Sequence, residues 1–206
     1  MQFHSIQCQV AVGDVTGGSD LEIIVGDMGG TVALVNVAGE IIWDVQLTGS
    51  IPFTPTLGDV DGDGLIDIVV VAVTELDGCH IWALRGDTGK ALDGYPISLP
   101  LNAMISAPVV LTSFHPSLPV DNTYKGFEDV NLYNVYYAES LLSIGSKVRN
   151  DQMRKKSEKK VITGLHLVVT SFEGHVYIID GITKCTQRID IGEHLYSTPL
   201  VDDITG

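Results

Sequence analysis

An acidic loop of nine residues, 59–67, constrains what this chain can fold into. The segment reads Asp-Val-Asp-Gly-Asp-Gly-Leu-Ile-Asp, with carboxylates at its first, third, fifth and ninth positions, and a β-branched apolar run follows it. These carboxylates would repel each other strongly in one tight turn, and a hard divalent cation with oxygen ligands removes that repulsion. Calcium tolerates such a crowded, flexible geometry better than magnesium does, and Gly64 allows the sharp bend because glycine adopts a positive φ without steric cost. We therefore predict a calcium site whose ligands are the carboxylates of Asp59, Asp61, Asp63 and Asp67 and the backbone carbonyl of Leu65.

Two alternatives compete with this interpretation. An EF-hand begins with the same D-x-D-x-D-G pattern, but it needs a bidentate Glu at position 12 and a helix on each side. Position 12 of this loop is Val70, in the middle of a β-branched run that is typical of a buried strand. The other alternative is a solvated acidic hairpin turn without an ion, although turns rarely carry so many Asp residues at this spacing. We therefore expect a calcium loop between two β-strands.

The acidic loop has an imperfect copy earlier in the chain. Residues 13–23 align with residues 58–68, and this spacing of 45 residues is typical of one four-stranded propeller blade. The copy predicts a weaker metal site, formed by Asp14, Thr16, Gly18, Asp20 and Glu22. Glu22 could equally be a surface residue. The chain ends in the first residues of the same pattern, a truncated site that contains Asp203 and Thr205.

Short apolar segments separated by Gly and Asp turns follow each loop. Strands at intervals of about eight to twelve residues indicate an all-β architecture, and no segment resembles a long amphipathic helix. The expected strands are 21–27, 31–37, 40–47, 66–73, 79–84, 90–97, 106–112, 165–171, 175–180 and 188–191. Their near-continuous apolar character is typical of stacked sheets that are buried on both faces. The predicted fold class is all-β, a partial β-propeller of about three four-stranded blades.

These loops and strands resemble the integrin-alpha-type propeller repeats known as FG-GAP or VCBS repeats. The calcium motif of that family, D-x-D-x-D-G-x-x-D, is matched in full by Asp59, Asp61, Asp63, Gly64 and Asp67, and the resemblance covers residues 5–113 and 161–206. Residues 171–181, Ser-Phe-Glu-Gly-His-Val-Tyr-Ile-Ile-Asp-Gly, most resemble a plant member whose repeats lie in a membrane-anchored ectodomain linked to pollen-wall (exine) formation. The resemblance implies calcium binding and a place in the secretory pathway, at the plasma membrane or outside the cell.

Residues 114–160 interrupt the repeat pattern. They separate propeller blades at 1–113 from a further blade at 161–206, which is truncated in the next repeat. Irregular insertions of this length are uncommon in compact domains. The basic end of the insertion, residues 149–160, could bind an anionic polysaccharide, a nucleic acid or a membrane. We favour a solvated flexible segment, because charged runs of this kind are usually solvated.

Charge and length narrow the range of partners. Residues 114–160 hold 8 of the 12 Lys and Arg residues and 6 of the 26 Asp and Glu residues, so the rest of the chain carries 4 basic residues against 20 acidic ones. Such a surface repels phosphate backbones, and we expect no nucleic-acid binding through the propeller. Propellers close with about four to eight blades, so three partial blades predict a fragment or truncated isoform of a longer protein. No segment resembles a signal peptide or a membrane span, and three scattered cysteines define no disulfide framework.

Three classes of function follow from these features. We expect a non-enzymatic binding module in which calcium stiffens the propeller, which in turn presents a surface to a protein or a cell-wall polysaccharide. A carbohydrate-active or quinoprotein-like enzyme is an alternative, but it needs a convergent acid, base and electrophile that the sequence does not indicate. An intracellular scaffold is the third. The tripeptide Arg85-Gly86-Asp87 matches an integrin ligand, yet it falls where a hairpin turn is expected, and we interpret it as that turn.

Overall fold

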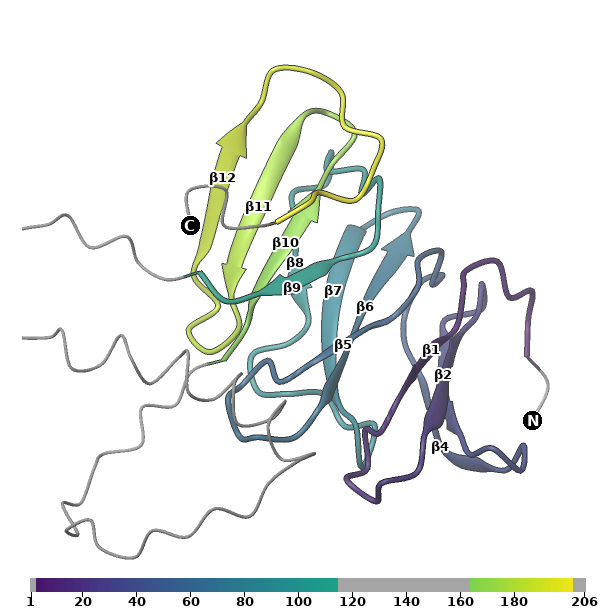
Figure 1. Cartoon of the computed structure of the whole chain (residues 1–206). Coiled ribbons are helices and arrows are strands. Elements are labelled where there is room, and N and C mark those ends of the chain that lie inside the picture. Colours follow the sequence, from purple (N-terminus) through teal and green to yellow (C-terminus); the bar gives the residue numbers. More distant parts are fainter. Residues whose placement is uncertain (1–2, 115–163, 202–206) are drawn as a thin grey trace, which may run out of the picture. The chain divides into compact units, whose positions relative to one another are not determined.

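The computed structural model describes residues 3–114 and 164–201, and every regular element within these ranges is a β-strand. The chain divides into two compact units, and the described residues belong to the unit formed by 1–114 and 161–206. Within it, twelve strands form three four-stranded antiparallel sheets, each with its strands in chain order (Figure 1). The first sheet contains β1 (Ala11–Gly13), β2 (Glu22–Gly26), β3 (Thr31–Val35) and β4 (Ile41–Gln46). The second contains β5 (Thr56–Gly58), β6 (Asp67–Thr74), β7 (Gly78–Arg85) and β8 (Ile97–Ser98), and the third contains β9 (Val110–Thr112), β10 (His166–Thr170), β11 (His175–Asp180) and β12 (Thr186–Asp190).

The sheets are built from tight hairpins that local sequence specifies. In the second sheet, β6 and β7 pair along their full length of eight residues each. Gly78 follows the turn of this hairpin with a φ of +78°, a conformation that glycine adopts without strain. In the first sheet, the Asp27 carboxylate accepts hydrogen bonds from the backbone N–H groups of Gly29 (2.9 Å) and Thr31 (2.8 Å). These bonds fix the turn between β2 and β3.

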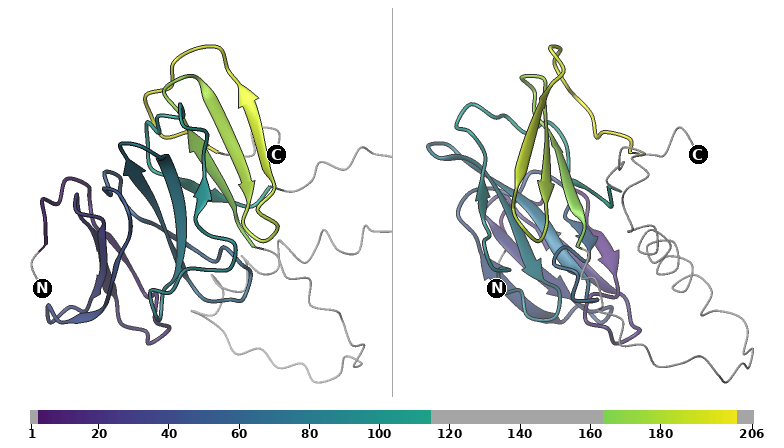
Figure 2. Two further views of the ribbon diagram at one scale, coloured as in Figure 1. Left: turned by 180° about the vertical axis from the view of Figure 1, so that it is seen from behind. Right: turned by 90° about the vertical axis from the view of Figure 1, so that its left-hand side faces the viewer.

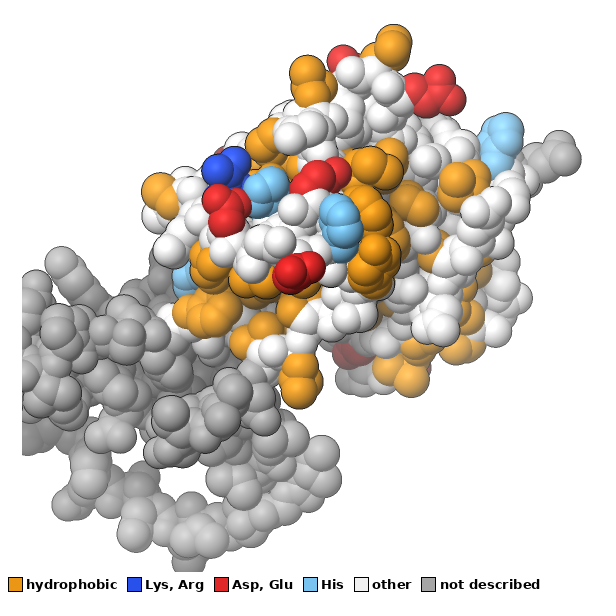
Figure 3. Space-filling view, turned by 90° about the horizontal axis from the view of Figure 1, so that it is seen from above, with side chains coloured by type: hydrophobic (Ala, Val, Ile, Leu, Met, Phe, Trp, Pro, Cys, Tyr) orange, Lys and Arg blue, Asp and Glu red, His pale blue; other side chains and the backbone are white. Residues whose placement is uncertain are grey.

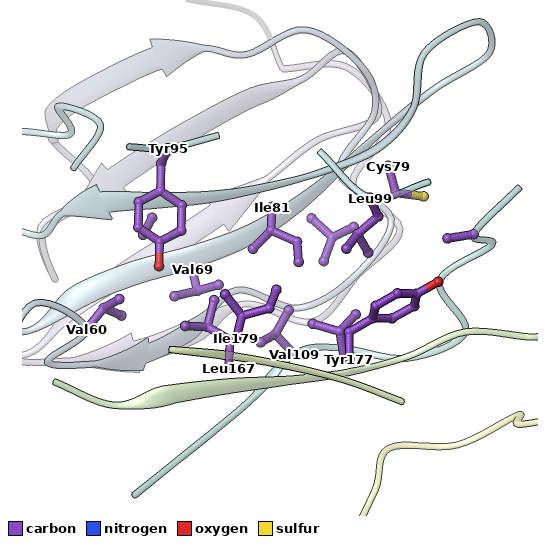
Figure 4. Packing of buried hydrophobic residues seen from close by; sticks show 14 of the residues in the cluster. Val60, Val69, Cys79, Ile81, Tyr95, Leu99, Val109, Leu167, Tyr177 and Ile179 are labelled. Atoms are coloured by element: carbon purple, nitrogen blue, oxygen red, sulfur yellow. The ribbon is translucent and has the colours of Figure 1, made fainter. Parts of the chain in front are cut away.

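The second sheet contributes to two hydrophobic cores because its central strands are buried on both faces. Ile68, Val70 and Ala72 of β6 lie in a cluster with buried residues of the first sheet. The alternate residues Val69 and Val71 lie in a cluster with buried residues of the third sheet. Figure 4 shows this second cluster between the sheets, and Figure 2 shows the three sheets from two further directions. Successive side chains of a strand point to opposite faces, so a strand between two sheets needs apolar residues throughout.

The structure confirms the predicted all-β class and most of the predicted strands. Every expected strand overlaps an observed one, and β6, β7, β10 and β11 lie within two residues of their predicted bounds. The sequence did not predict β1 and β5, because strands of three residues carry too little periodicity. Each of these short strands pairs with the first residues of the long strand that follows the acidic loop.

The predicted strand at 90–97 is wrong except for its last residue. Ala91 forms a single bridge to β7, and residues 92–96 then leave the sheet. Gly94 has a φ of +82°, which belongs to a turn and not to a strand. Pro96 has no N–H group to donate to a neighbouring strand. Regular pairing therefore resumes only in β8.

Other expectations concern the insertion, the membrane and the thiols. Nearly all of the predicted insertion at 114–160, and both Asp203 and Thr205, lie outside the described residues. In the described part of the chain, no helix combines the length and apolar character needed to cross a membrane. Cys8, Cys79 and Cys185 are free thiols, and Cys79 is buried.

We predict that the core between the second and third sheets holds these sheets together. Ile179 is fully buried in this core, so Ile179→Ala should lower the free energy of unfolding by about 2–5 kcal/mol, because it removes apolar contacts and leaves a cavity. Urea denaturation followed by circular dichroism measures this loss. Leu76 is 88% exposed, and Leu76→Ala is the matched control, which should change stability by less than about 0.5 kcal/mol. Equal losses in the two variants would contradict the described packing.

Candidate metal centre

The acidic loop connects β5 to β6 in the second sheet. Its two ends lie side by side because Gly58, the last residue of β5, pairs with Asp67, the first residue of β6. Gly62 and Gly64 have φ values of +79° and +89°. The positive φ that the sequence predicts for Gly64 is therefore confirmed, and the two bends fold the chain back on itself over a short distance.

Backbone N–H groups orient every carboxylate of the loop. The Asp59 side chain accepts hydrogen bonds from Gly62 (2.7 Å to Oδ1) and from Gly64 (2.9 Å to Oδ2). Further bonds run from Val60 to Asp67 Oδ2 (2.9 Å), from Asp63 to Asp61 Oδ1 (3.1 Å) and from Leu65 to Asp63 Oδ1 (2.8 Å). These bonds fix the carboxylates in place and leave one oxygen each of Asp61, Asp63 and Asp67 for other partners.

Three of the carboxylates converge on one point. Asp59, Asp61 and Asp67 each offer an oxygen, and these oxygens lie within 4.8 Å of one another. An all-oxygen donor set matches the preference of hard cations such as calcium. The structure thus brings together three of the four carboxylates that the sequence predicts as ligands, and Asp63 is not in this group of three. The Leu65 carbonyl remains a predicted ligand.

Burial makes this group of carboxylates electrostatically unfavourable without a cation. Asp67 is only 1% exposed, and burial raises its pKa to about 7, with the charges of Asp61, Asp63 and Asp59 adding to the increase. Burial also raises the pKa of Asp59, although two backbone hydrogen bonds oppose the change. Loss of solvation and like charge both favour the neutral acid. A bound divalent ion would reverse this preference by stabilising the ionised form.

Arg85 is a residue of the site that the sequence did not predict. It is the last residue of β7 and lies opposite Asp67 in the hairpin. Its guanidinium donates to Asp63 Oδ2 (2.9 Å) and contacts Asp61 Oδ2 (3.5 Å), and the bond to Asp63 raises the Arg85 pKa. The register of the β6–β7 hairpin could have indicated Arg85. If Val73 pairs with Cys79, the same register pairs Asp67 with Arg85 and places the arginine beside the loop.

The Arg85-Gly86-Asp87 tripeptide lies at the end of β7 and in the turn that follows it. Gly86 is buried, and a Cβ atom there would meet the carbonyl oxygens of Ile66 and Val15 at 2.3 and 2.6 Å. The Gly86 carbonyl also accepts a hydrogen bond from the indole N–H of Trp43 (2.8 Å). With its glycine packed and its arginine paired to the acidic loop, the tripeptide has a structural explanation as a turn.

The first loop has a similar backbone but different side-chain chemistry. Asp14 accepts hydrogen bonds from the backbone N–H groups of Gly17, Gly18 and Ser19, at 2.8–3.1 Å. Glu22 Oε2 accepts the Val15 N–H (3.0 Å), as Asp67 accepts that of Val60. Its other oxygen, Oε1, accepts the hydroxyl of Thr16 (2.8 Å), which aligns with Asp61 of the second loop. A hydroxyl donor thus satisfies the buried Glu22 carboxylate, where the second loop presents a further negative charge.

The remaining residues of the weaker predicted site do not converge in the same way. Asp20 is exposed, and Gly18 contributes its N–H group to Asp14. Within residues 3–114 and 164–201, the carboxylates of this loop form no group of three like that of Asp59, Asp61 and Asp67. Metal binding at the first loop remains a prediction with less geometric support than the second.

Comparisons with known proteins identify the architecture. No protein-family model and no curated protein matches the sequence. Among solved structures, the chain is similar to BBS1N in complex with ARL6DN, in a crystal soaked with lead. The two chains are 11% identical with a TM-score of 0.52, and the match covers 95% of this chain and 43% of BBS1N. The crystal soaked with mercury gives the same values. BamB from Moraxella catarrhalis is 14% identical with a TM-score of 0.45, over 91% of this chain and 37% of that one. The chain spans less than half the length of the solved structures that it matches.

At these identities the likeness establishes the fold alone. The three four-stranded antiparallel sheets match propeller blades, so the chain is an all-β, partial β-propeller. One of its loops carries an acidic group that could hold a metal ion. Membership of the FG-GAP or VCBS family stays a prediction from the resemblance.

We predict that Asp67 makes the folded protein less stable in a chelator as pH rises from about 4 to 7. The folded-state pKa of Asp67 lies near 7, above its ordinary value of 3.8, so within this window the folded state binds more protons than the unfolded state. The stabilisation that protonated Asp67 contributes is fully present at pH values below its unfolded-state pKa and is lost as pH rises through its folded-state pKa.

Thermal melts in EDTA between pH 5 and pH 8 measure the effect. The wild-type melting temperature should drop over this range by on the order of 5 °C more than that of Asp67→Asn, which keeps an acceptor for the Val60 N–H but does not ionise. Added calcium should reduce the difference, since it binds the ionised loop. Parallel pH profiles in the two proteins would contradict the assignment of a buried, proton-binding Asp67.

Proposed function

We propose that this chain is a calcium-binding β-propeller module with a non-enzymatic role in protein or polysaccharide recognition. The observation that carries the proposal is the convergence of Asp59, Asp61 and Asp67, each oriented by backbone N–H groups, at the start of a buried central strand. The ion would tie β5, the loop and β6 into one rigid unit. It would act as a structural element and take part in no reaction.

The donor chemistry favours calcium among biological cations. All side-chain donors of the loop are carboxylate oxygens, which hard cations prefer, and calcium accepts six to eight such ligands in flexible geometry. Magnesium demands near-ideal octahedral geometry and keeps several waters, so it should compete poorly. We expect affinity in the range of extracellular calcium modules, with a dissociation constant of roughly 10⁻⁴–10⁻³ M.

The surface of the propeller supports recognition of proteins or sugars over recognition of nucleic acids. On the face seen in Figure 3, hydrophobic side chains lie among Asp, Glu and His side chains, and Lys and Arg side chains are few. Outside residues 114–160 the chain has 4 basic residues against 20 acidic ones, which opposes binding to phosphate backbones. The structurally similar BBS1N was crystallised in complex with ARL6DN, a precedent for protein binding by this fold.

The cellular setting of the proposal comes from the repeat resemblance and from the expected affinity. A site with a dissociation constant of roughly 10⁻⁴–10⁻³ M is at least half occupied where calcium is in the millimolar range, as it is outside cells. The FG-GAP or VCBS resemblance points in the same direction, toward the secretory pathway, the plasma membrane or the extracellular space. The plant member that residues 171–181 most resemble is linked to formation of the pollen-wall exine. We therefore propose the pollen wall as the setting in which this module contacts a cell-wall polysaccharide.

We predict that the chain binds one calcium ion at the second loop and that this binding raises its melting temperature. Isothermal titration calorimetry should give a saturable isotherm for the wild type, and Asp61→Ala/Asp63→Ala should lose it, because two carboxylates of the loop are removed. The calcium-dependent rise in melting temperature should disappear in the same variant, as expected for a ligand that binds only the folded state. Magnesium at equal concentration should give a smaller rise.

A matched control separates the loop from general acidity. Asp190 is exposed in β12 and lies outside the loop, so Asp190→Ala should bind calcium like the wild type. A folded wild-type chain that shows no binding at millimolar calcium would overturn the calcium proposal and favour an intracellular scaffold. Cleavage of a polysaccharide by the purified protein would overturn the non-enzymatic role.

A further inference from the structure

Two carboxylates of the predicted calcium loop are paired with a cation of the chain itself. Arg85 donates to Asp63 Oδ2 (2.9 Å) and contacts Asp61 Oδ2 (3.5 Å). In both residues the other oxygen, Oδ1, already accepts a backbone N–H group. The guanidinium therefore contacts the oxygens that the loop backbone leaves available, and Asp61 is also one of the three converging carboxylates.

We propose that Arg85 is a built-in competitor of calcium, which stabilises the loop as its counter-ion until the divalent ion displaces it. This inference rests on the proposed calcium site and adds its regulation. Arg85 sets a threshold: the loop keeps its fold at low calcium and exchanges one cation for another as calcium rises. The exchange replaces the single positive charge of the guanidinium with the double charge of the ion.

The exchange is easy because the ion pair is partly exposed. The side chains of Arg85, Asp61 and Asp63 are 39%, 26% and 30% exposed, so water can solvate each of them when the pair separates. Exposed ion pairs of this kind contribute little to stability. A calcium ion that binds several carboxylates at once gains more than this, so displacement of the guanidinium is favourable once calcium is abundant.

The first blade lacks this arrangement, which supports a specific role for Arg85. The residue at the corresponding hairpin position is Asn36, one step beyond the pair formed by Ile23 and Val35. The Asn36 side chain accepts the N–H groups of Ala38 and Glu40 (3.0 and 2.9 Å), so it fixes its own turn. A loop satisfied by a hydroxyl needs no counter-ion, whereas the loop with four carboxylates has an arginine beside it.

The test compares calcium affinity in the wild type, Arg85→Gln and Arg85→Lys by isothermal titration calorimetry at fixed low salt. Arg85→Gln should bind up to about fivefold more tightly, because calcium then breaks no ion pair, and an exposed pair of this kind changes an equilibrium constant by at most about fivefold. Arg85→Lys keeps the charge and should stay within about threefold of the wild type. The control Arg188→Gln removes an exposed arginine of the third sheet and should leave the affinity unchanged.

Thermal melts supply a second readout that a purely structural arginine would not give. In EDTA, Arg85→Gln should melt below the wild type, because the carboxylates lose their counter-ion, while in saturating calcium the two proteins should melt together. Equal or weaker calcium binding by Arg85→Gln, with binding intact in the wild type, would overturn this inference and leave the calcium site standing. No binding in any of the folded proteins would overturn the calcium site, and the competition with it. If Arg85→Gln failed to fold, NMR would follow the Arg85 Nε–H resonance of the wild type during the calcium titration. A shift that saturates together with calcium binding would support displacement of the guanidinium, and an unchanged resonance would overturn it.

Discussion

Four carboxylates share the nine residues of the loop between β5 and β6, and one of them, Asp67, is buried at the first residue of a long central strand. Burial of a carboxylate is unfavourable unless the group is hydrogen-bonded, protonated or paired with a cation. The Val60 N–H satisfies one oxygen of Asp67, and the charge that remains in the loop is reduced by a proton, by the Arg85 pairs with Asp61 and Asp63, or by a metal ion.

The two acidic loops show that the same backbone can meet the requirement in two ways. In both loops a carboxylate at the start of the central strand accepts the N–H of a buried valine, Val15 or Val60. The first loop then supplies the Thr16 hydroxyl as a donor, whereas the second supplies the negatively charged Asp61. The third and fifth positions, Thr16 and Gly18 in one loop and Asp61 and Asp63 in the other, therefore separate a loop closed by hydrogen bonds from one that favours a cation. The repeat preserves the turn, and the side chains decide what it binds.

Much of this arrangement was predictable from the sequence, because the loop is local. Its carboxylate spacing and the positive φ of Gly64 depend on residues that are close in the chain, and the structure agrees with both. The β-branched strands were predictable for the same reason, while the segment at 90–97 was not, because its apolar residues fill the core from a turn and not from a strand. Arg85 was missed because its role depends on pairing across a hairpin, a relation between residues 18 positions apart. The register of the hairpin would have indicated Arg85, because the register determines which residue of one strand lies opposite each residue of the other.

The position of the loop explains how an ion at the surface could affect the whole propeller. Asp67 is the first residue of β6. The side chains of this strand point alternately into two hydrophobic cores, one shared with the first sheet and one with the third. A cation that fixes Asp67 therefore restrains a strand on which the packing of all three sheets depends. The first loop starts β2, which contributes to one core only, through residues such as Ile24. The loop with more uncompensated negative charge thus leads into β6, the strand that packs in both cores. A cation bound at this loop would therefore stabilise the packing of the second sheet against both the first and the third.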